Sequence, residues 1–141
     1  MERYIGLDLG TVTLGIATSD SLGFVHGLET FRFPKEAYSQ ARKRVHDLVN
    51  QTGIKNIVIG LPINMDGTQG WRAESSIKFK DDLLKEDPSL KIELQDERLT
   101  SVSAHKTLYD LNVSGKKHKD SVDRIAACEI LDFYIRVKGN K

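Results

Sequence analysis

The chain has 141 residues, of which 39% are hydrophobic and 29% charged, and its formal net charge is +1. This length suits one domain with a single core, and the balanced charge excludes a protein that binds nucleic acid over a broadly basic surface. The single cysteine excludes an intramolecular disulfide, the four scattered histidines lack zinc-site spacing, and no apolar run approaches the ~18 residues of a membrane span. We therefore expect one cytoplasmic domain over residues 1–141, with no signal peptide and no membrane contact.

Short β-rich runs open the chain. The segments RYIGLDLG, TLGIATSD and FVHGLETFRF are separated by Gly, Ser and Asp, which predicts consecutive antiparallel strands at residues 3–9, 13–19 and 24–32. After Pro34, apolar residues recur at helical spacing as far as Gly53, which predicts a helix. NIVIGLP then forms a short continuous apolar run, typical of a strand buried on both faces.

The second half of the chain alternates helices with one more strand. WRAESSIKFKDDLLKE predicts a helix that Pro88 stops, LKIELQDE a fifth strand, and TSVSAHKTLYDL another helix. GKKHK is interpreted as a basic loop, and DSVDRIAACEILDFYIRV as a final, largely buried helix. The order β-β-β-α-β-α-β-α-α predicts an α/β fold with a mixed five-stranded sheet, in which parallel strands extend three antiparallel ones and helices cover both faces.

Acidic residues occur where ligands collect in such sheets, at the carboxyl ends of strands. Asp8 interrupts the apolar first strand near its end, Asp96 and Glu97 close the fifth strand, and Asp123 lies near the start of the last helix. These acids can meet only if the first and fifth strands lie side by side and the last helix packs across them. Clustered carboxylates suit Mg²⁺, and two such ions ~3.5–4 Å apart can promote an in-line displacement at phosphorus.

Each acid also has a purely structural interpretation. Asp8 could be a turn aspartate that accepts hydrogen bonds from backbone N–H groups. Asp123 could interact with the helix dipole or complete a capping box with Asp120. The pair at the end of the fifth strand could be solvated surface charges. From the residues alone, both interpretations stay open.

Four segments together resemble the YqgF family, also called RuvX, whose fold is that of ribonuclease H. They are GLDLGTVTLGIATSD, GLPINMDGTQGWRAE, DERLTSVSA and DSVDRIAACEIL, in the family's order and spacing. The resemblance implies a ribonuclease H-like nuclease that trims precursor small-subunit ribosomal RNA during ribosome biogenesis. A Holliday-junction resolvase acting on branched DNA is the alternative. A non-catalytic nucleic-acid-binding module is a third possibility, because fold does not imply function.

The family's acids fall on Asp8, Glu97 and Asp123, and the resemblance implies that all three are catalytic and bind two Mg²⁺ or Mn²⁺ ions. Strand alternation lets only one of Asp96 and Glu97 face such a site. We expect Glu97, because related nucleases use a glutamate on that strand, with Asp96 as the alternative. Family members commonly carry a basic residue where this chain has Thr13, which would weaken or move a phosphate contact.

Further residues near these acids are candidates for binding substrate. They are Arg98, Thr100, Gly67, Lys116, Lys117 and Lys119. A salt bridge, a helix cap, a turn and a solvated loop explain them equally well. Trp71 could stack on an unpaired base, but we expect it to be a partly buried anchor at the start of its helix. The expected partner is structured RNA, or branched DNA in the alternative, and the expected state is a monomer or weak homodimer.

Overall fold

A computed structural model describes residues 2–62, 70–96 and 115–139, and within the last range the side chains of residues 124–138. The elements are β1 (Tyr4–Leu9), β2 (Thr13–Ser19), β3 (Val25–Arg32), α1 (Tyr38–Thr52), β4 (Asn56–Leu61), α2 (Trp71–Glu86), β5 (Lys91–Asp96) and α4 (Gly115–Gly139). The three predicted antiparallel strands are confirmed to within one residue at each end. The helix expected over residues 100–111 lies outside the described residues. In the described part of the chain, no helix combines the length and apolar character needed to cross a membrane.

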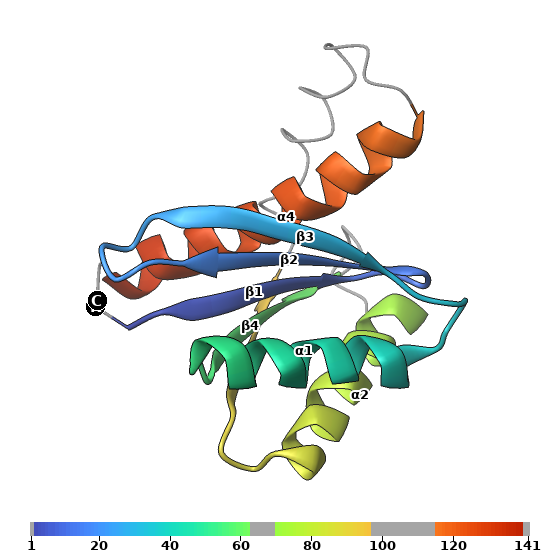
Figure 1. The fold of residues 1–141 in the computed structure, drawn as a ribbon, viewed down its shortest axis with the longest axis horizontal. Helices are drawn as coiled ribbons and strands as arrows, with labels where there is room; N and C mark the ends of the chain where they lie inside the picture. The colour runs from blue at the N-terminus through green and yellow to red at the C-terminus, as the bar shows by residue number, and fades with distance from the viewer. Residues whose placement is uncertain (1, 63–69, 97–114, 140–141) are drawn as a thin grey trace.

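The strands form one sheet in the order β3-β2-β1-β4-β5 (Figure 1). The pairs β1–β2 and β2–β3 are antiparallel, whereas β1–β4 and β4–β5 are parallel, which confirms the predicted mixed sheet. The condition that the first and fifth strands lie side by side is not met, because β4 lies between them. The residues of β4 from Ile57 to Ile59 are at most 1% exposed, as suits an inner strand, while β5 carries exposed Lys91 and Glu93 and takes the edge.

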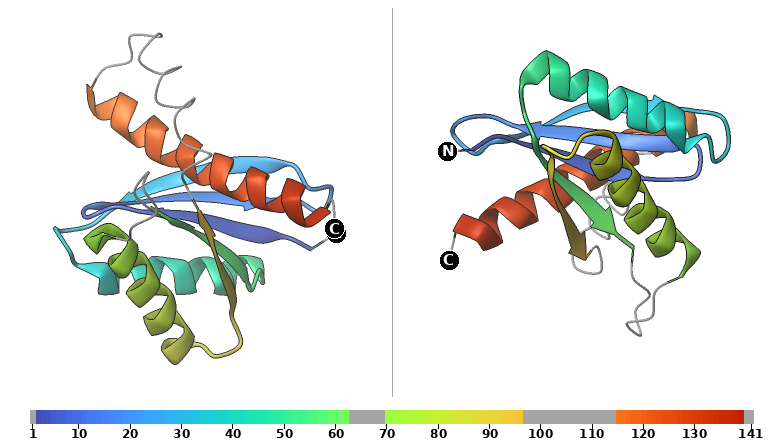
Figure 2. Two further views of the ribbon diagram at one scale, coloured as in Figure 1. Left: turned by 180° about the vertical axis from the view of Figure 1, so that it is seen from behind. Right: turned by 90° about the horizontal axis from the view of Figure 1, so that it is seen from below.

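Helices cover both faces of the sheet, as predicted. Helices α1 and α2 lie on one face and α4 crosses the other (Figures 1 and 2). Ile5, Leu7 and Leu9 of β1 are buried in the core on the α1/α2 side, whereas Tyr4 is buried in a second core against α4. This alternation along β1 assigns each of its residues to one face.

The segment GKKHK is helical rather than a loop, because α4 already begins at Gly115. The prediction of a basic loop there is therefore wrong. Lysine has a good helix propensity, and the segment holds no proline or interior glycine that would end a helix. The final helix is thus extended toward its N-terminus by residues that carry positive charge.

Gly6 is the point of closest approach between β1 and α4. A Cβ atom at Gly6 would lie 2.8 Å from the Cβ of Leu131 and 3.0 Å from the carbonyl oxygen of Ala127. Nearer the start of β1, the Tyr4 ring packs edge-on against Tyr134 with centroids 5.5 Å apart, and Lys138 Nζ donates to Tyr4 Oη at 2.9 Å. These contacts show that α4 runs antiparallel to β1, with its last turns over the start of the strand.

Replacing Gly6 with alanine should lower the free energy of unfolding by about 1–3 kcal/mol, because the added methyl group overlaps α4. Urea denaturation followed by circular dichroism measures this loss. Gly27→Ala is the matched control, since a Cβ at Gly27 would meet Cys128 Sγ at an ordinary 3.4 Å. Both changes restrict the unfolded chain equally, so equal losses in the two variants would contradict the role assigned to Gly6.

Candidate active site

Asp8 lies near the carboxyl end of the central strand β1 and on the face that α4 covers. Its neighbours Leu7 and Leu9 are buried on the α1/α2 face, and strand alternation turns Asp8 the other way. Asp8 is half-buried, unlike the four fully buried residues before it in β1. It shares its face with Gly6, two residues back, where α4 makes its closest contact. The aspartate in the apolar strand therefore lies next to the helix–sheet interface.

Glycines lie on both sides of Asp8 in the sheet. Gly15 of β2 pairs directly with Asp8, and the pairing of Leu7 with Ile59 puts Gly60 of β4 level with it. Neither glycine supplies a side chain, so neither neighbouring strand crowds the carboxylate. Carboxylate oxygens are the ligands that Mg²⁺ and Mn²⁺ prefer. The chemistry of Asp8 and its setting in the sheet therefore fit a hydrated divalent cation.

Strand alternation separates Asp96 from Asp8. Ile92 and Leu94 of β5 pack against the core on the α1/α2 side, so Asp96, two residues further on, lies on that same face. The pairing of Asp96 with Leu61 gives the same result, because Leu61 is two residues beyond buried Ile59. This placement disfavours Asp96 as a ligand beside Asp8. Glu97 lies outside the described residues.

Most of the other predicted site residues cannot be compared with the structure. Gly67, Arg98 and Thr100 lie outside the described residues. Asp123 and the lysines at 116, 117 and 119 belong to α4, of which only the backbone is described there. Among the residues that are described, no group of three or more His, Cys, Asp or Glu side chains could hold a metal ion.

Thr13 has a structural place in the β1–β2 turn. It is only 3% exposed, and its carbonyl accepts a hydrogen bond from the N–H of Gly10 at 2.8 Å. A Cβ at Gly10 would approach Thr13 Oγ1 to 3.0 Å, so the turn is tightly packed. Thr13 thus closes the turn after Asp8. Its side chain is buried, so it does not face the solvent from which a phosphate would bind.

Trp71 is 59% exposed, so the expectation of a partly buried anchor is wrong. The residues that α2 buries form one stripe: Ala73, Ser76, Phe79 and Leu83. Trp71 precedes this stripe by two residues, which turns it to the opposite side of the helix. The next residue, Arg72, donates from Nη2 to the carbonyl oxygen of Leu9 at 3.4 Å. The start of α2 therefore lies at the end of β1, next to Asp8.

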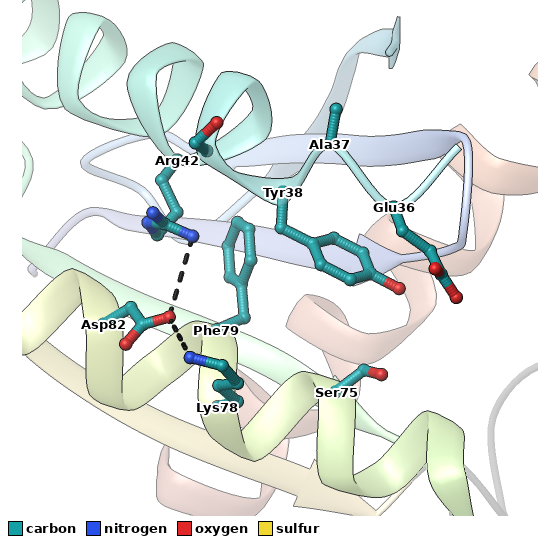
Figure 3. A pocket seen from close by; sticks show the side chains of 9 residues that line it. Glu36, Ala37, Tyr38, Arg42, Ser75, Lys78, Phe79 and Asp82 are labelled. Carbon is teal, nitrogen blue, oxygen red and sulfur yellow. Dashed lines mark hydrogen bonds and ion pairs between the residues drawn. The ribbon is translucent and has the colours of Figure 1, made fainter. Parts of the chain in front are cut away.

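A cavity of about 390 Å³ lies between α1 and α2, lined by the rings of Tyr38 and Phe79 (Figure 3). Asp82 accepts a hydrogen bond from Lys78 at 3.0 Å and lies 3.7 Å from Arg42. The hydrogen bond from Lys78, with the charge of Arg42, lowers the pKa of Asp82. These charges satisfy one another, and the cavity lies on the face of the sheet away from Asp8. It is not part of the predicted acidic site.

Two tyrosines and a lysine hold the C-terminal half of α4 on the sheet. Burial raises the pKa of Tyr134 to about 12, and its hydrogen bond to Glu93 of β5 adds to the rise. Lys138 Nζ lies 5.3 Å from the centroid of the Tyr4 ring and 5.7 Å from that of Tyr134. Its hydrogen bond to Tyr4 raises the pKa of Lys138. This cluster fixes the position of the C-terminal half of α4 along β1.

Comparison with known proteins shows which family the chain belongs to. The sequence profile described as "RuvX: Holliday junction resolvase" matches residues 2–137. The chain belongs to the RuvX family. It is 42% identical to a protein of Geobacillus sp. (strain WCH70) named "Putative pre-16S rRNA nuclease", over 96% of this chain and 99% of that protein. A protein of the same name from Acetivibrio thermocellus is 40% identical over 97% of each chain.

The fold of this RuvX-family chain is similar to that of a solved structure described as "T. thermophilus RuvC in complex with Holliday junction substrate". The TM-score is 0.60 over 99% of this chain and 96% of that one, with 11% sequence identity. At this identity the similarity concerns the fold. It confirms the predicted ribonuclease H-like architecture.

The free energy of unfolding should fall as the pH rises from 10 to about 12. Below pH 10, Tyr134 is neutral in both states; above it, the unfolded chain loses the proton first and is favoured until the folded phenol ionises near pH 12. The loss amounts to at most about 2 kcal/mol. Urea unfolding at several alkaline pH values measures it. Tyr134→Phe should remove this component, and an unchanged pH dependence in that variant would contradict the assignment.

Proposed function

We propose that this RuvX-family chain is a divalent-metal-dependent nuclease that trims precursor small-subunit ribosomal RNA in the cytoplasm. The observation that carries the proposal is the placement of Asp8 at the carboxyl end of the central strand, facing α4 with glycines on either side. Carboxylate oxygens at the carboxyl end of a strand suit a hydrated divalent metal ion, which keeps several waters and can bridge to a phosphate. The names of the two relatives support the choice of substrate.

The packing of α4 supports Asp123 as a second ligand. Moving along β1 from Tyr4 to Gly6, the contacts on α4 shift back from Lys138 and Tyr134 to Leu131 and Ala127. Two more residues of strand, about 6.6 Å, lead to Asp8. One more turn of helix, about 5.4 Å, leads from Ala127 to position 123. Both steps point the same way, so we infer that Asp123 lies over Asp8.

The alternation of β5 supports Glu97 as the third ligand. If the strand continues by one residue, Glu97 faces the α4 side, as Asp8 does. The backbones of β1 and β5 are two strand spacings apart, about 9–10 Å. Gln95 is the residue of β5 that is level with Gly60 and Asp8, so position 97 would follow two residues further along the same face. Glutamate is one methylene longer than aspartate, so it suits the more distant strand.

We propose that Asp8, Glu97 and Asp123 hold two Mg²⁺ or Mn²⁺ ions. Bound there, the ions would lower the pKa of an attacking water and stabilise the leaving oxygen of the phosphodiester. The three carboxylates provide hard oxygen ligands and leave coordination positions open for water and phosphate. A thiol nucleophile is not involved, because burial raises the pKa of Cys128 and keeps it protonated.

Substrate binding would extend along the first turns of α4. Positions 116 and 119 precede position 123 by seven and four residues, which places all three on one side of the helix. We propose that Lys116 and Lys119, with Lys117 beside them, attract phosphates toward the acids. Arg98, Thr100 and Gly67 remain candidates for the same role.

Cleavage of a Holliday junction is the second candidate function, and the description of the family profile favours it. A resolvase must cut two symmetry-related strands, which calls for a dimer with two equivalent sites. RNA trimming requires no such symmetry. We rank RNA first because the full-length relatives carry that name.

Asp8→Asn should reduce cleavage of precursor ribosomal RNA at least about 100-fold, because it removes a metal ligand worth several kcal/mol in the transition state. Gel assays with labelled RNA and with a four-way DNA junction, each with Mg²⁺, Mn²⁺ or EDTA, measure this. We expect the wild-type protein to cleave the RNA with Mg²⁺ or Mn²⁺, and we expect EDTA to abolish this cleavage. Preferential cutting of the junction would favour the resolvase, and binding without any cleavage would favour the non-catalytic module.

Glu97→Gln should likewise abolish cleavage, whereas Asp96→Asn should change it less than tenfold. The two residues are adjacent, but alternation puts Asp96 on the α1/α2 face. The pair is internally matched, since each substitution removes one negative charge at the end of β5. Single-turnover cleavage rates distinguish them. A larger loss in Asp96→Asn than in Glu97→Gln would reverse the assignment.

A further inference from the structure

We propose that Trp71 is a stacking platform for an unpaired base, so that this protein binds single-stranded RNA beside the site in preference to fully paired nucleic acid. This inference rests on the proposed function for the position of the cut. It adds the substrate class that the site would accept. The contact at Trp71 does not itself depend on metal or cleavage, and the two can be tested separately.

The exposure of Trp71 calls for an explanation. A tryptophan side chain is among the largest apolar groups, and leaving most of it in water forgoes the burial that normally stabilises a fold. Trp71 is 59% exposed and lies off the buried stripe of α2. Its backbone is nonetheless well held, because Ser75 Oγ donates to the Trp71 carbonyl at 3.0 Å. The ring is thus presented to solvent from a fixed turn of helix.

The location of Trp71 distinguishes it from the other exposed large hydrophobic residues of the described chain. Leu22 and Phe24 lie at the β2–β3 turn, and Val137 lies in the last turns of α4, all at the end of the sheet where β1 begins. Leu28 lies at a bulge in the edge strand β3. Within the described residues, Trp71 alone lies at the end of the sheet that carries Asp8.

Arg72 connects Trp71 to the predicted site. Its Nη2 donates to the carbonyl of Leu9, the residue that follows Asp8. The guanidinium has five N–H donors, so this contact leaves capacity to bind a phosphate as well. Aromatic stacking beside a cationic group is the combination with which proteins bind single strands without reading their sequence. Because Trp71 and Arg72 are consecutive residues, the ring would hold a base and the guanidinium a phosphate of the same single strand.

Stacking on Trp71 would discriminate by structure. An unpaired base exposes both of its flat faces and can lie on an indole ring, whereas bases inside a duplex are stacked on each other. Ends and loops of a precursor RNA offer such bases. The fully paired arms of a four-way junction do not. The proposal therefore favours RNA trimming over junction cleavage on grounds independent of any relative's name.

The chain contains one tryptophan, so its fluorescence reports on this site alone. We would titrate the Asp8→Asn variant, in Mg²⁺, with a single-stranded oligoribonucleotide and with a blunt RNA duplex of the same length. The expected result is quenching of Trp71 by the single strand and not by the duplex. Equal quenching by both, or binding of the single strand with no quenching, would overturn the proposal.

The double variant Phe24→Trp/Trp71→Phe is the matched control. It moves the only tryptophan to a position of similar exposure, 65% against 59%, at the opposite end of the sheet. A flat ring remains at position 71, so the single strand should still bind, but the fluorescence should not change. Quenching of the relocated tryptophan would mean that the signal is not specific to position 71, which would overturn the proposal.

Trp71→Ala should weaken binding of the labelled single strand about 5- to 150-fold, the range expected for loss of one base–aromatic stack. Binding of the duplex and the thermal unfolding midpoint should not change. If the wild-type protein cleaves no RNA while Trp71 is quenched by single strands, the proposed function fails and this inference stands. If cleavage is normal and Trp71 is neither quenched nor needed for binding, this inference fails and the proposed function stands.

Discussion

The contact between Gly6 and α4 is the constraint on which the arrangement of this face depends. Because β1 has no side chain at that position, the backbone of α4 comes within ordinary contact distance of the strand. The neighbouring strands also present small residues on this side: Gly15, Ala17, Gly27 and Gly60. A helix packed so closely has little freedom to slide or rotate. The contacts with Tyr4 and Gly6 therefore set the register of α4 on β1 over residues 127–138.

The two faces of strand β1 have different roles: one contributes to the core and the other carries Asp8. Ile5, Leu7 and Leu9 are at most 4% exposed on the α1/α2 side, and each contributes about 1.5–3 kcal/mol by burial. Asp8 on the other face is only half-buried, so its carboxylate keeps part of its hydration and costs less than a fully buried charge. The chain can thus tolerate Asp8 where the apolar pattern calls for a buried residue. A metal ion would reduce that cost further.

Much of this structure could be predicted from the sequence because local chemistry determines it. Gly53 ends α1 in the left-handed conformation, with φ of 75°, as a glycine after a helix commonly does. The strand order is harder to predict from the sequence, because alternation shows on which face of the sheet a residue lies and not which strand is the neighbour. The apolar run of β4 did hold the missing signal, since a strand buried on both faces belongs inside the sheet. This signal favours an inner position for β4, which lies between β1 and β5.

Residue spacing also predicts the orientation of two single residues near the proposed site, Trp71 and Asp96. Counting back from the buried Ala73 and Phe79 shows that Trp71 is off the stripe of α2, so its exposure could have been read from helical spacing. In the same way, alternation along β5 puts Asp96 on the face of Ile92 and Leu94, which is opposite to the face of Asp8. The helical start of α4 was less accessible, because a run of lysines is compatible with both a loop and a helix, and packing further along the helix decides.

The end of β1 joins the two halves of the proposed site. Leu9 belongs to the α1/α2 face and accepts the hydrogen bond from Arg72, while its neighbour Asp8 belongs to the α4 face. Recognition by α2 and chemistry beneath α4 would therefore meet at adjacent residues of one strand, although the helices lie on opposite sides of the sheet (Figure 2). A strand of nucleic acid in contact with both must pass around the edge formed by the strand ends. A flexible single strand would follow that path more easily than a stiff duplex, which agrees with the proposed stacking of an unpaired base on Trp71.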